Sequence, residues 1–268
     1  MKRVSHFRPY LSAFRLRLKM EWSYRSAAIA GILTQVVFGL ILCGLYDALL
    51  SARDPHLFRE TVTYVWLQQL FFRAVLSTDA ELSRQIMTGS IVSSMVRPVH
   101  LCSYCYVRNL AMKLTGSFMR ALPAIPLFLL LPPAYQPLLP ASPSALIAFL
   151  FSLALGFLVM SAVENICLGV QLHTLDNRGI NAIIHLLQEI FCGNIIPLTL
   201  FPERFQTFLR LQPFSQALDL PLRLYLGILP VQELPIVLCL QALWALLLYC
   251  LSEYLFRHGL RSLVIHGG

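Results

Sequence analysis

Three residues of the chain, His100, Cys102 and Cys105, form an H-x-C-x-x-C pattern, a spacing that can hold zinc. Structural zinc takes four ligands, and no second pair of cysteines or histidines lies nearby in the sequence. Packing at a helix end is therefore the favoured interpretation, with zinc binding as the alternative. We predict no metal site.

A second set of residues consists of charged and polar side chains that interrupt otherwise apolar segments. A charge that faces lipid near the bilayer centre costs roughly 3 kcal/mol or more, so these groups should face protein or a water-filled cavity. His185 and Glu189 are four residues apart, which places them on one helical face where they can share a hydrogen bond. A proton relay or substrate contact is one interpretation, and a structural polar clamp between helices is the favoured one. The set comprises Arg73, Glu164, Asn165, His185 and Glu189, and we expect solvent to reach Glu164 near the end of its segment.

No sequence motif supports catalysis by this chain. The phosphate-binding pattern G-x-x-x-x-G-K-[ST] is missing, as are the zinc-protease H-E-x-x-H and the esterase G-x-S-x-G patterns. We therefore predict that the chain is not an enzyme, holds no cofactor and does not hydrolyse nucleotide by itself.

The composition indicates to which class of protein the chain belongs, and therefore which kind of helix or strand carries the polar groups named above. Apolar residues make up 57% of the 268 residues and charged residues only 13%, with a mean hydropathy of +0.67. The apolar residues come in runs of roughly 20, the length that spans about 30 Å of hydrocarbon. We predict an all-α polytopic membrane protein with a single transmembrane domain over residues 1–268. The seven cysteines imply no disulfide framework.

The net charge of +8 does not point to nucleic acid. The basic residues form short clusters beside the apolar runs, so anionic lipid head groups are the expected partner.

The apolar runs predict six membrane spans joined by short polar segments. Span two is short and carries Gln68, Gln69 and Arg73, so it needs protein or water on one side. Pro123 and Pro126 should kink span three. The predicted spans are Ala27–Leu50, Thr61–Leu76, Val107–Leu131, Ala145–Leu172, Ile180–Leu200 and Leu234–Phe256, and a charged loop from Arg53 to Glu60 separates the first two.

Three segments outside the spans have a pattern of their own. Residues 1–25 predict an amphipathic helix along the membrane surface, with a plain basic tail as the alternative, and we expect no signal peptide. Residues 77–106 form a polar connection whose apolar residues can bury one side of a short helix. Residues 201–230 are too polar to cross a membrane and too apolar for a free loop, which predicts short helices that dip into one interface.

The basic residues also predict an orientation. The N-terminal arm, the 77–106 connection with Arg108 and Lys113 at its edge, Arg178 and the C-terminal tail fall on one side of the predicted spans. The side with more Lys and Arg is normally cytoplasmic, so we predict that both termini lie inside.

Three stretches resemble one family, the ABC-2 type permeases with six spans and no attached ATPase. The first is YRSAAIAGILTQVVFGLILCGLY from Tyr24 to Tyr46, similar to the family's opening span. The second is IMTGSIVSSMVRPVHLCSYCYVRNL from Ile86 to Leu110, and the third is GNIIPLTLFPERFQTFLRLQPFSQALDLPLRLYLG from Gly193 to Gly227.

This resemblance implies an exporter permease in a bacterial inner membrane. Such permeases pair with a second copy or a sister permease and bind two separate subunits that hold ATP and Mg. The usual cargo is an amphiphile of lipid, glycan or drug-like kind. By resemblance the 77–106 connection couples to the ATPase, with an ordinary loop as the alternative, and residues 201–230 form re-entrant helices that close the outer end. The coupling residues would be Arg84, Gly89, Ser90, Arg97 and Pro98, and the outer gate Pro197, Phe201, Pro202 and Pro213.

Two other functions remain open from the residues alone. One is a channel or secondary carrier that works without ATP and uses Arg73, His185 and Glu189 as an ion path. The other is a membrane-embedded enzyme acting on lipids.

Overall fold

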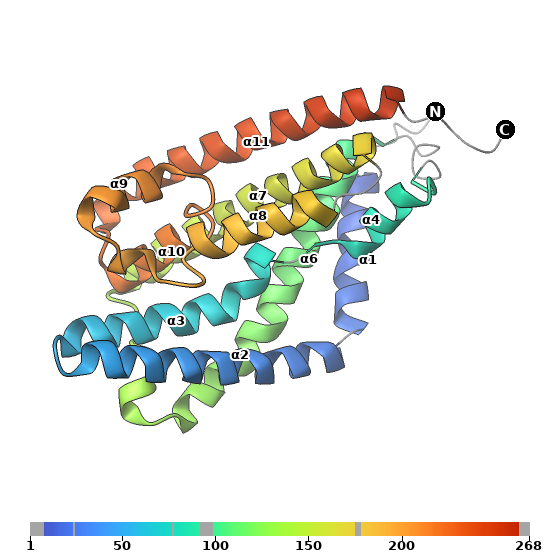
Figure 1. Cartoon of the computed structure of the whole chain (residues 1–268). Helices are drawn as coiled ribbons and strands as arrows, with labels where there is room; N and C mark the ends of the chain where they lie inside the picture. The colour runs from blue at the N-terminus through green and yellow to red at the C-terminus, as the bar shows by residue number, and fades with distance from the viewer. Residues whose placement is uncertain (1–7, 24, 77, 92–98, 175–177, 263–268) are drawn as a thin grey trace.

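The computed structural model describes residues 8–23, 25–76, 78–91, 99–174 and 178–262, and within these it contains helices and no strand (Figure 1). The α-helices are α1 Arg8–Ser23, α2 Arg25–Tyr46, α3 Pro55–Leu76, α4 Ala80–Met87, α6 Leu101–Ala124, α7 Pro143–Thr174, α8 Arg178–Phe191, α9 Glu203–Leu211, α10 Asp219–Leu226 and α11 Leu234–Ser262. Short π or 3-10 turns follow α2 and α6 and connect the later helices: η1 Asp47–Ser51, η2 Ile125–Leu130, η3 Pro133–Tyr135, η4 Leu198–Leu200 and η5 Val231–Glu233.

Three helices of the described chain are long and apolar enough to cross a membrane. They are Ala28–Ser51, Pro143–Thr174 and Val231–Arg261, with mean hydropathies of 2.3, 2.5 and 2.2. These helices correspond to the first, fourth and sixth predicted spans. The all-helical fold and the membrane class are therefore confirmed.

The second predicted span starts earlier in the structure than the sequence suggested. Helix α3 begins at Pro55 instead of Thr61, because the Asp54 carboxylate accepts hydrogen bonds from the backbone N–H groups of His56 at 3.1 Å and Leu57 at 2.9 Å. A carboxylate at this position with proline directly after it is a strong helix start. Most of the predicted charged loop from Arg53 to Glu60 is thus helical.

The third predicted span is also shifted. Helix α6 begins at Leu101, inside the segment predicted as a polar connection up to residue 106. Its first turns carry Leu101, Cys102 and Cys105, which are buried in an apolar cluster and therefore favour a packed helix. The chain changes from α to 3-10 geometry at Ile125, next to Pro126, which cannot donate a backbone hydrogen bond.

The prediction of the fifth span, Ile180–Leu200, is wrong at its C-terminal end. Helix α8 stops at Phe191, and its 14 residues cover about 21 Å, less than the hydrocarbon thickness. Gly193 has a φ of +82°, its N–H bonds to Ile190 O at 3.2 Å, and Asn194 N–H bonds to Glu189 O at 2.9 Å. This pair of bonds is a Schellman helix end, which needs a left-handed residue and therefore favours glycine.

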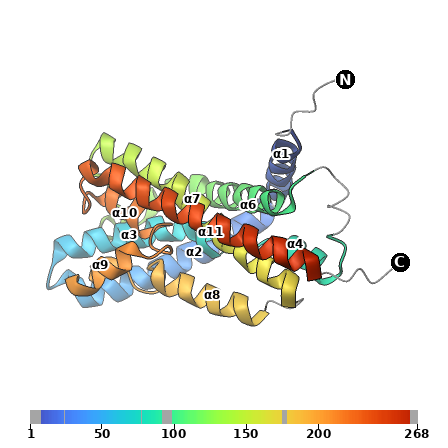
Figure 2. The same cartoon turned by 90° about the horizontal axis from the view of Figure 1, so that it is seen from above.

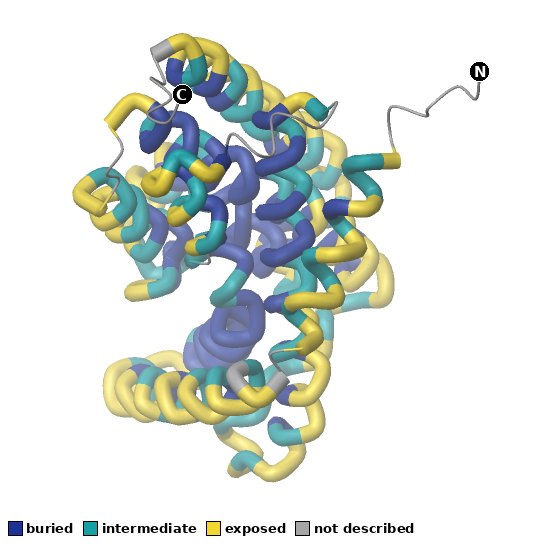
Figure 3. Tube along the Cα trace, turned by 90° about the vertical axis from the view of Figure 1, so that its right-hand side faces the viewer, coloured by how far each residue is buried: buried dark blue, intermediate teal, exposed yellow. Residues whose placement is uncertain are grey.

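Helices α2, α3, α7, α8 and α11 run in roughly the same direction, α6 crosses them obliquely, and α1 runs across one end (Figures 1 and 2). Figure 3 shows which parts of the trace are buried and which are exposed. Most of α3 is enclosed, whereas α2 and α11 expose large apolar side chains such as Leu33 and Ile236. Apolar surface of this extent is typical of a helix that faces lipid or another protein.

Two smaller apolar clusters mark the ends of the bundle. At the end we call the α4 end, Leu82 and Ile86 of α4 pack with Leu168 of α7 and Phe256 of α11. At the opposite α10 end, Leu220 and Leu224 of α10 pack with Ala148 and Val237.

Candidate coupling site

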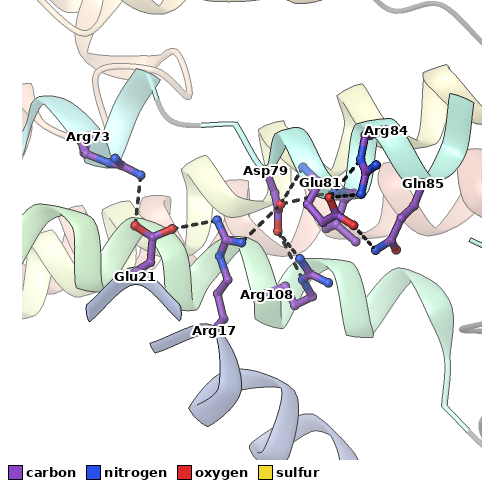
Figure 4. A network of polar contacts seen from close by, with 9 residues as sticks. Arg17, Glu21, Arg73, Asp79, Glu81, Arg84, Gln85 and Arg108 are labelled. Carbon is purple, nitrogen blue, oxygen red and sulfur yellow. Dashed lines mark hydrogen bonds and ion pairs between the residues drawn. The ribbon is translucent and has the colours of Figure 1, made fainter. Parts of the chain in front are cut away.

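Asp79 is the centre of a charged network at the α4 end (Figure 4). Its side chain is completely buried and caps α4 by accepting hydrogen bonds from the N–H groups of Glu81 at 3.2 Å and Leu82 at 3.4 Å. Arg108 of α6 donates to the same carboxylate at 3.0 Å, and Arg17 of α1 lies 3.6 Å from it. One carboxylate therefore joins α1, α4 and α6.

The network reaches α3 through the arm helix α1. Arg17 also pairs with Glu21 at 2.7 Å, and Glu21 contacts Arg73 of α3 at 3.5 Å (Figure 4). Arg73, which the sequence suggested as a pathway residue or clamp, therefore belongs to this network. The arm is helical from Arg8 and is held by specific contacts, so the alternative of a plain basic tail is wrong for residues 8–23.

A polar cavity of about 410 Å³ lies against this network. It is lined by Arg17, Arg73, Asp79, Arg108 and neighbouring residues of α4 and α6. The network is thus partly open on one side, which leaves its side chains room to rearrange.

Helix α4 has two different faces. Leu82 and Ile86 are fully buried at the α4 end, and the Gln171 side chain of α7 donates to Ser83 O at 3.0 Å. On the other face the Arg84 side chain is 70% exposed and pairs with Glu81 at 2.9 Å. Hydrogen bonds from Gln85, and then from Arg84, lower the pKa of the Glu81 carboxyl. The buried face rests on α7, a contact that the order of the helices in the sequence does not indicate.

Of the predicted coupling residues, Arg84 lies in α4, and Gly89 and Ser90 directly follow it. Gly89, with a φ of +70°, ends α4, and the hydroxyl of Ser90 lies 2.8 Å from that of Thr88. The predicted coupling residues Arg97 and Pro98 lie outside the described residues.

The far end of the connection is fastened to α1 and α11. The N–H of His100 donates to the Tyr10 hydroxyl at 2.9 Å, and its Nε2 lies 3.0 Å from Glu253 of α11. Cys102 Sγ lies 3.5 Å from the Ser252 hydroxyl, and Cys105 is buried. Across the part of the chain that the structure describes, no group of three or more His, Cys, Asp and Glu side chains is placed to hold a metal ion.

Charged groups in the bundle interior form a second cluster. Glu164 of α7 is only 3% exposed, so the expectation that solvent reaches it is wrong. Lys113 of α6, predicted at the edge of the polar connection, is completely buried, and it interacts electrostatically with both Glu164 and His185. Asn165 donates to Cys102 O at 3.2 Å and to the Ser252 hydroxyl at 3.3 Å, which ties α7 to α6 and α11.

The predicted pair on α8 is only half-buried. His185 and Glu189 influence each other electrostatically, but within the described chain no hydrogen bond or ion pair joins them. Gln188, which lies between them in sequence, is the one fully buried residue of α8, with its amide 3.7 Å from Met160 Sδ.

A third polar cluster, which we call the Asp219 latch, holds the α10 end together. Asp219 of α10 accepts from the Tyr64 hydroxyl of α3 at 2.9 Å and from Arg223 Nε at 2.7 Å. Arg223 also donates to Gln206 of α9 at 3.0 Å. The latch connects both short helices of the predicted outer segment to α3.

The predicted gate residues flank these short helices. Pro197 and Phe201 bound the η4 turn, Pro202 directly precedes α9, and Pro213 lies in the turn between α9 and α10. Proline lacks a backbone donor, which explains why each helix begins or ends there.

Three residues of these clusters were missed by sequence reasoning, namely Asp79, Asp219 and Arg223, and so was Arg120 of α6, which interacts electrostatically with Arg73 and Glu21. Arg120 had a usable signal, because it is a charge inside the third predicted span. The acidic residues had none, because their partners lie far away in the sequence.

Comparison with known proteins agrees with this architecture. The sequence model of the ABC-2 family transporter proteins matches residues 57–267, more than half of the chain, and leaves α1 and α2 outside the match. No curated protein and no solved structure matches the chain. The extent of the family match, on an all-helical chain with membrane-spanning helices, shows that this protein belongs to the ABC-2 family of transporter proteins, as a transport component that is not itself the ATPase.

Proposed function

We propose that this chain is the permease subunit of an exporter powered by ATP that a separate ABC subunit hydrolyses. Two copies of that subunit, with ATP and Mg, would serve a pair of permeases, either two copies of this chain or this chain and a sister. The cargo would be an amphiphile of lipid, glycan or drug-like kind. The observation that carries the proposal is α4, which has one exposed face and another face joined to α1, α6 and α7.

The exposed face of α4 would receive the ATPase. It consists of Arg84, Met87, Thr88 and Ser90, all exposed and continuous along one short helix and its end. Because Leu82 and Ile86 are closely packed on α7 and Asp79 is bonded to α6, a displacement of α4 would move these helices as a rigid body. Arg97 and Pro98 follow later in the same connection and would take part in the coupling.

In this proposal the chain crosses the membrane six times. Helices α3 and α6, with 22 and 24 residues, cover about 33 and 36 Å and are long enough to cross. Helix α8 would cross together with the η4 segment, and α9 and α10 would be re-entrant helices that close the outer end. Both termini would then be cytoplasmic in a bacterial inner membrane, and α1 would lie along its surface.

The test is copurification of the full chain with an ATP-binding subunit, followed by ATPase and transport assays. We expect Arg84→Glu and Arg97→Glu to weaken the complex and to uncouple hydrolysis from transport. Arg204→Glu, an exposed charge reversal at the α10 end, is the matched control. If both α4-end variants transport normally, the coupling role is refuted.

The buried Lys113 and Glu164, which interact electrostatically with each other, and the half-buried His185 favour a second candidate, a carrier or channel that works without ATP. Ion flux by the purified chain alone in liposomes, abolished by Glu164→Gln, would support this candidate and refute the exporter.

A further inference from the structure

An apolar pocket of about 790 Å³ opens between the arm helix α1 and helices α2 and α6. Leu18 and Trp22 of α1 form one wall, Ile29 of α2 another, and Phe118 and Leu122 of α6 a third. Its volume lies in the range of roughly 300–1,000 Å³ that is usual for small-molecule sites. The single polar side chain among its lining residues is Thr115, whose hydroxyl bonds to Ala111 O in its own helix at 2.7 Å.

Arg120 lies beside this pocket, and in α6 it falls between the lining residues Phe118 and Leu122. Its guanidinium passes directly over Gly31 of α2, where a Cβ would meet Arg120 Cζ at 2.5 Å, so a larger residue at this position would displace the guanidinium. Arg120 also lines the small adjoining cavity that shares Ile32 with the apolar pocket.

Within the described chain Arg120 makes no hydrogen bond or ion pair, and a second guanidinium lies nearby. Arg73 of α3 crosses Gly116 of α6, one turn before Arg120, and the two guanidiniums repel each other. Glu21 attracts Arg120, but it is already paired with Arg17 at 2.7 Å and contacts Arg73 at 3.5 Å. An anion placed at Arg120 would therefore be stabilised.

From these two features together we infer that the groove between α1, α2 and α6 is a site for an anionic phospholipid, with an acyl chain in the apolar pocket and the phosphate at Arg120. Trp22 at the pocket wall is the residue type found at the level of lipid head groups. The exposed Arg15 and Lys19 of α1 add positive charge that attracts an anionic membrane surface. This lipid would stay bound beside α1 and would not be transported, so the inference is independent of the proposed function.

The experiment compares lipids on the purified, delipidated full chain in detergent. Phosphatidylglycerol or phosphatidylcholine is titrated in, and bound lipid is followed by native mass spectrometry together with the melting temperature. We expect wild type to prefer phosphatidylglycerol, and Arg120→Gln to lower its affinity for that lipid roughly fivefold. Arg84→Gln, which removes an exposed charge outside the groove, should keep the full preference.

A second pair of variants keeps the test decisive if Arg120→Gln does not fold. Arg120→Lys retains the charge and should retain the preference. Thr115→Trp fills the pocket and should weaken binding of both lipids while leaving Arg120 in place. Equal binding of the two lipids by wild type would overturn the inference, and so would an Arg120→Gln variant that keeps the preference. The inference would also be overturned if a second copy of the chain covers the groove. In that case the wild type is a dimer, and Thr115→Trp makes it monomeric without changing lipid binding.

Discussion

The Asp79 network and the Asp219 latch use the same chemistry at opposite ends of the bundle with different degrees of enclosure. In the latch, Asp219 and Arg223 are 0% and 1% exposed and their contact is 2.7 Å. In the network, Arg73 is 27% exposed and the outer contacts stretch to 3.5 and 3.6 Å beside a 410 Å³ cavity. A fully enclosed pair holds one arrangement, whereas a partly open one can change partners. We therefore call the Asp219 latch at the α10 end the anchor, because its ion pair is fixed, and the Asp79 network at the α4 end the joint, because its outer ion pairs can rearrange.

The largest effect we predict is on the anchor. Asp219→Ala leaves the Arg223 guanidinium buried without its carboxylate, and removing one member of a buried ion pair costs about 3–5 kcal/mol. Unfolding of the purified protein in detergent would measure the change, with the exposed Arg204→Gln as the control. A loss below about 0.5 kcal/mol, the size usual for surface substitutions, would contradict the distinction between anchor and joint.

A smaller loss of stability is expected at the joint. Asp79→Asn removes the charge that Arg108 and Arg17 share but keeps an oxygen that can cap α4. Hydrogen bonds to charged groups contribute about 1.5–3 kcal/mol, so we expect a loss of about 2 kcal/mol.

The same variant should have a second consequence that the anchor variant lacks. We expect transport per ATP hydrolysed to fall in Asp79→Asn, because α4 is no longer fastened to α6 and α1. Normal coupling at reduced stability would show that Asp79 is only structural.

Gly193 tests how the anchor is assembled. A Cβ at Gly193 would meet the Tyr64 hydroxyl at 2.5 Å, and the residue would keep a positive φ, so Gly193→Ala should cost about 1–2 kcal/mol and displace Tyr64 from Asp219. Gly44→Ala in α2 meets nothing within 4 Å and should be neutral or slightly stabilising. Equal unfolding free energies for the two variants would contradict this account.

The smallest effect concerns the exposed face of α4. The lowered pKa of Glu81 means that its contacts stabilise the fold above the ordinary value of 4.5 and are lost as pH falls through the lowered value. Because Gln85 and Arg84 both donate hydrogen bonds to Glu81, Gln85→Ala and Arg84→Gln should each raise this pKa. Carboxyl NMR of labelled Glu81 measures both, and an unchanged pKa in either variant would refute the assignment.

Prediction from sequence succeeded where a pattern is local. The first, fourth and sixth spans are continuous apolar runs, and the short helix α4 follows from apolar residues at helical spacing. Helix ends were less accessible, because the start at Asp54 and the end at Gly193 depend on backbone bonds that composition does not reveal.

The joint itself could not have been predicted. Asp79 meets Arg17 and Arg108, residues far away in both directions along the chain, and no spacing rule links them. Lys113 and Arg120 were within reach, since a charge in an apolar span demands a partner, but which partner depends on how helices cross.

The sequence by itself determined that this chain is helical, enters a membrane and resembles the ABC-2 transporters, because hydrophobicity and helix periodicity are properties of short segments. Only the tertiary structure decided that α4 rests on α7, that Asp79 binds three helices, and that Asp219 is enclosed with Arg223. The reason is physical: the stability of a buried charge depends on the dielectric and the partners around it, and these are set by helices that meet only after the chain has folded.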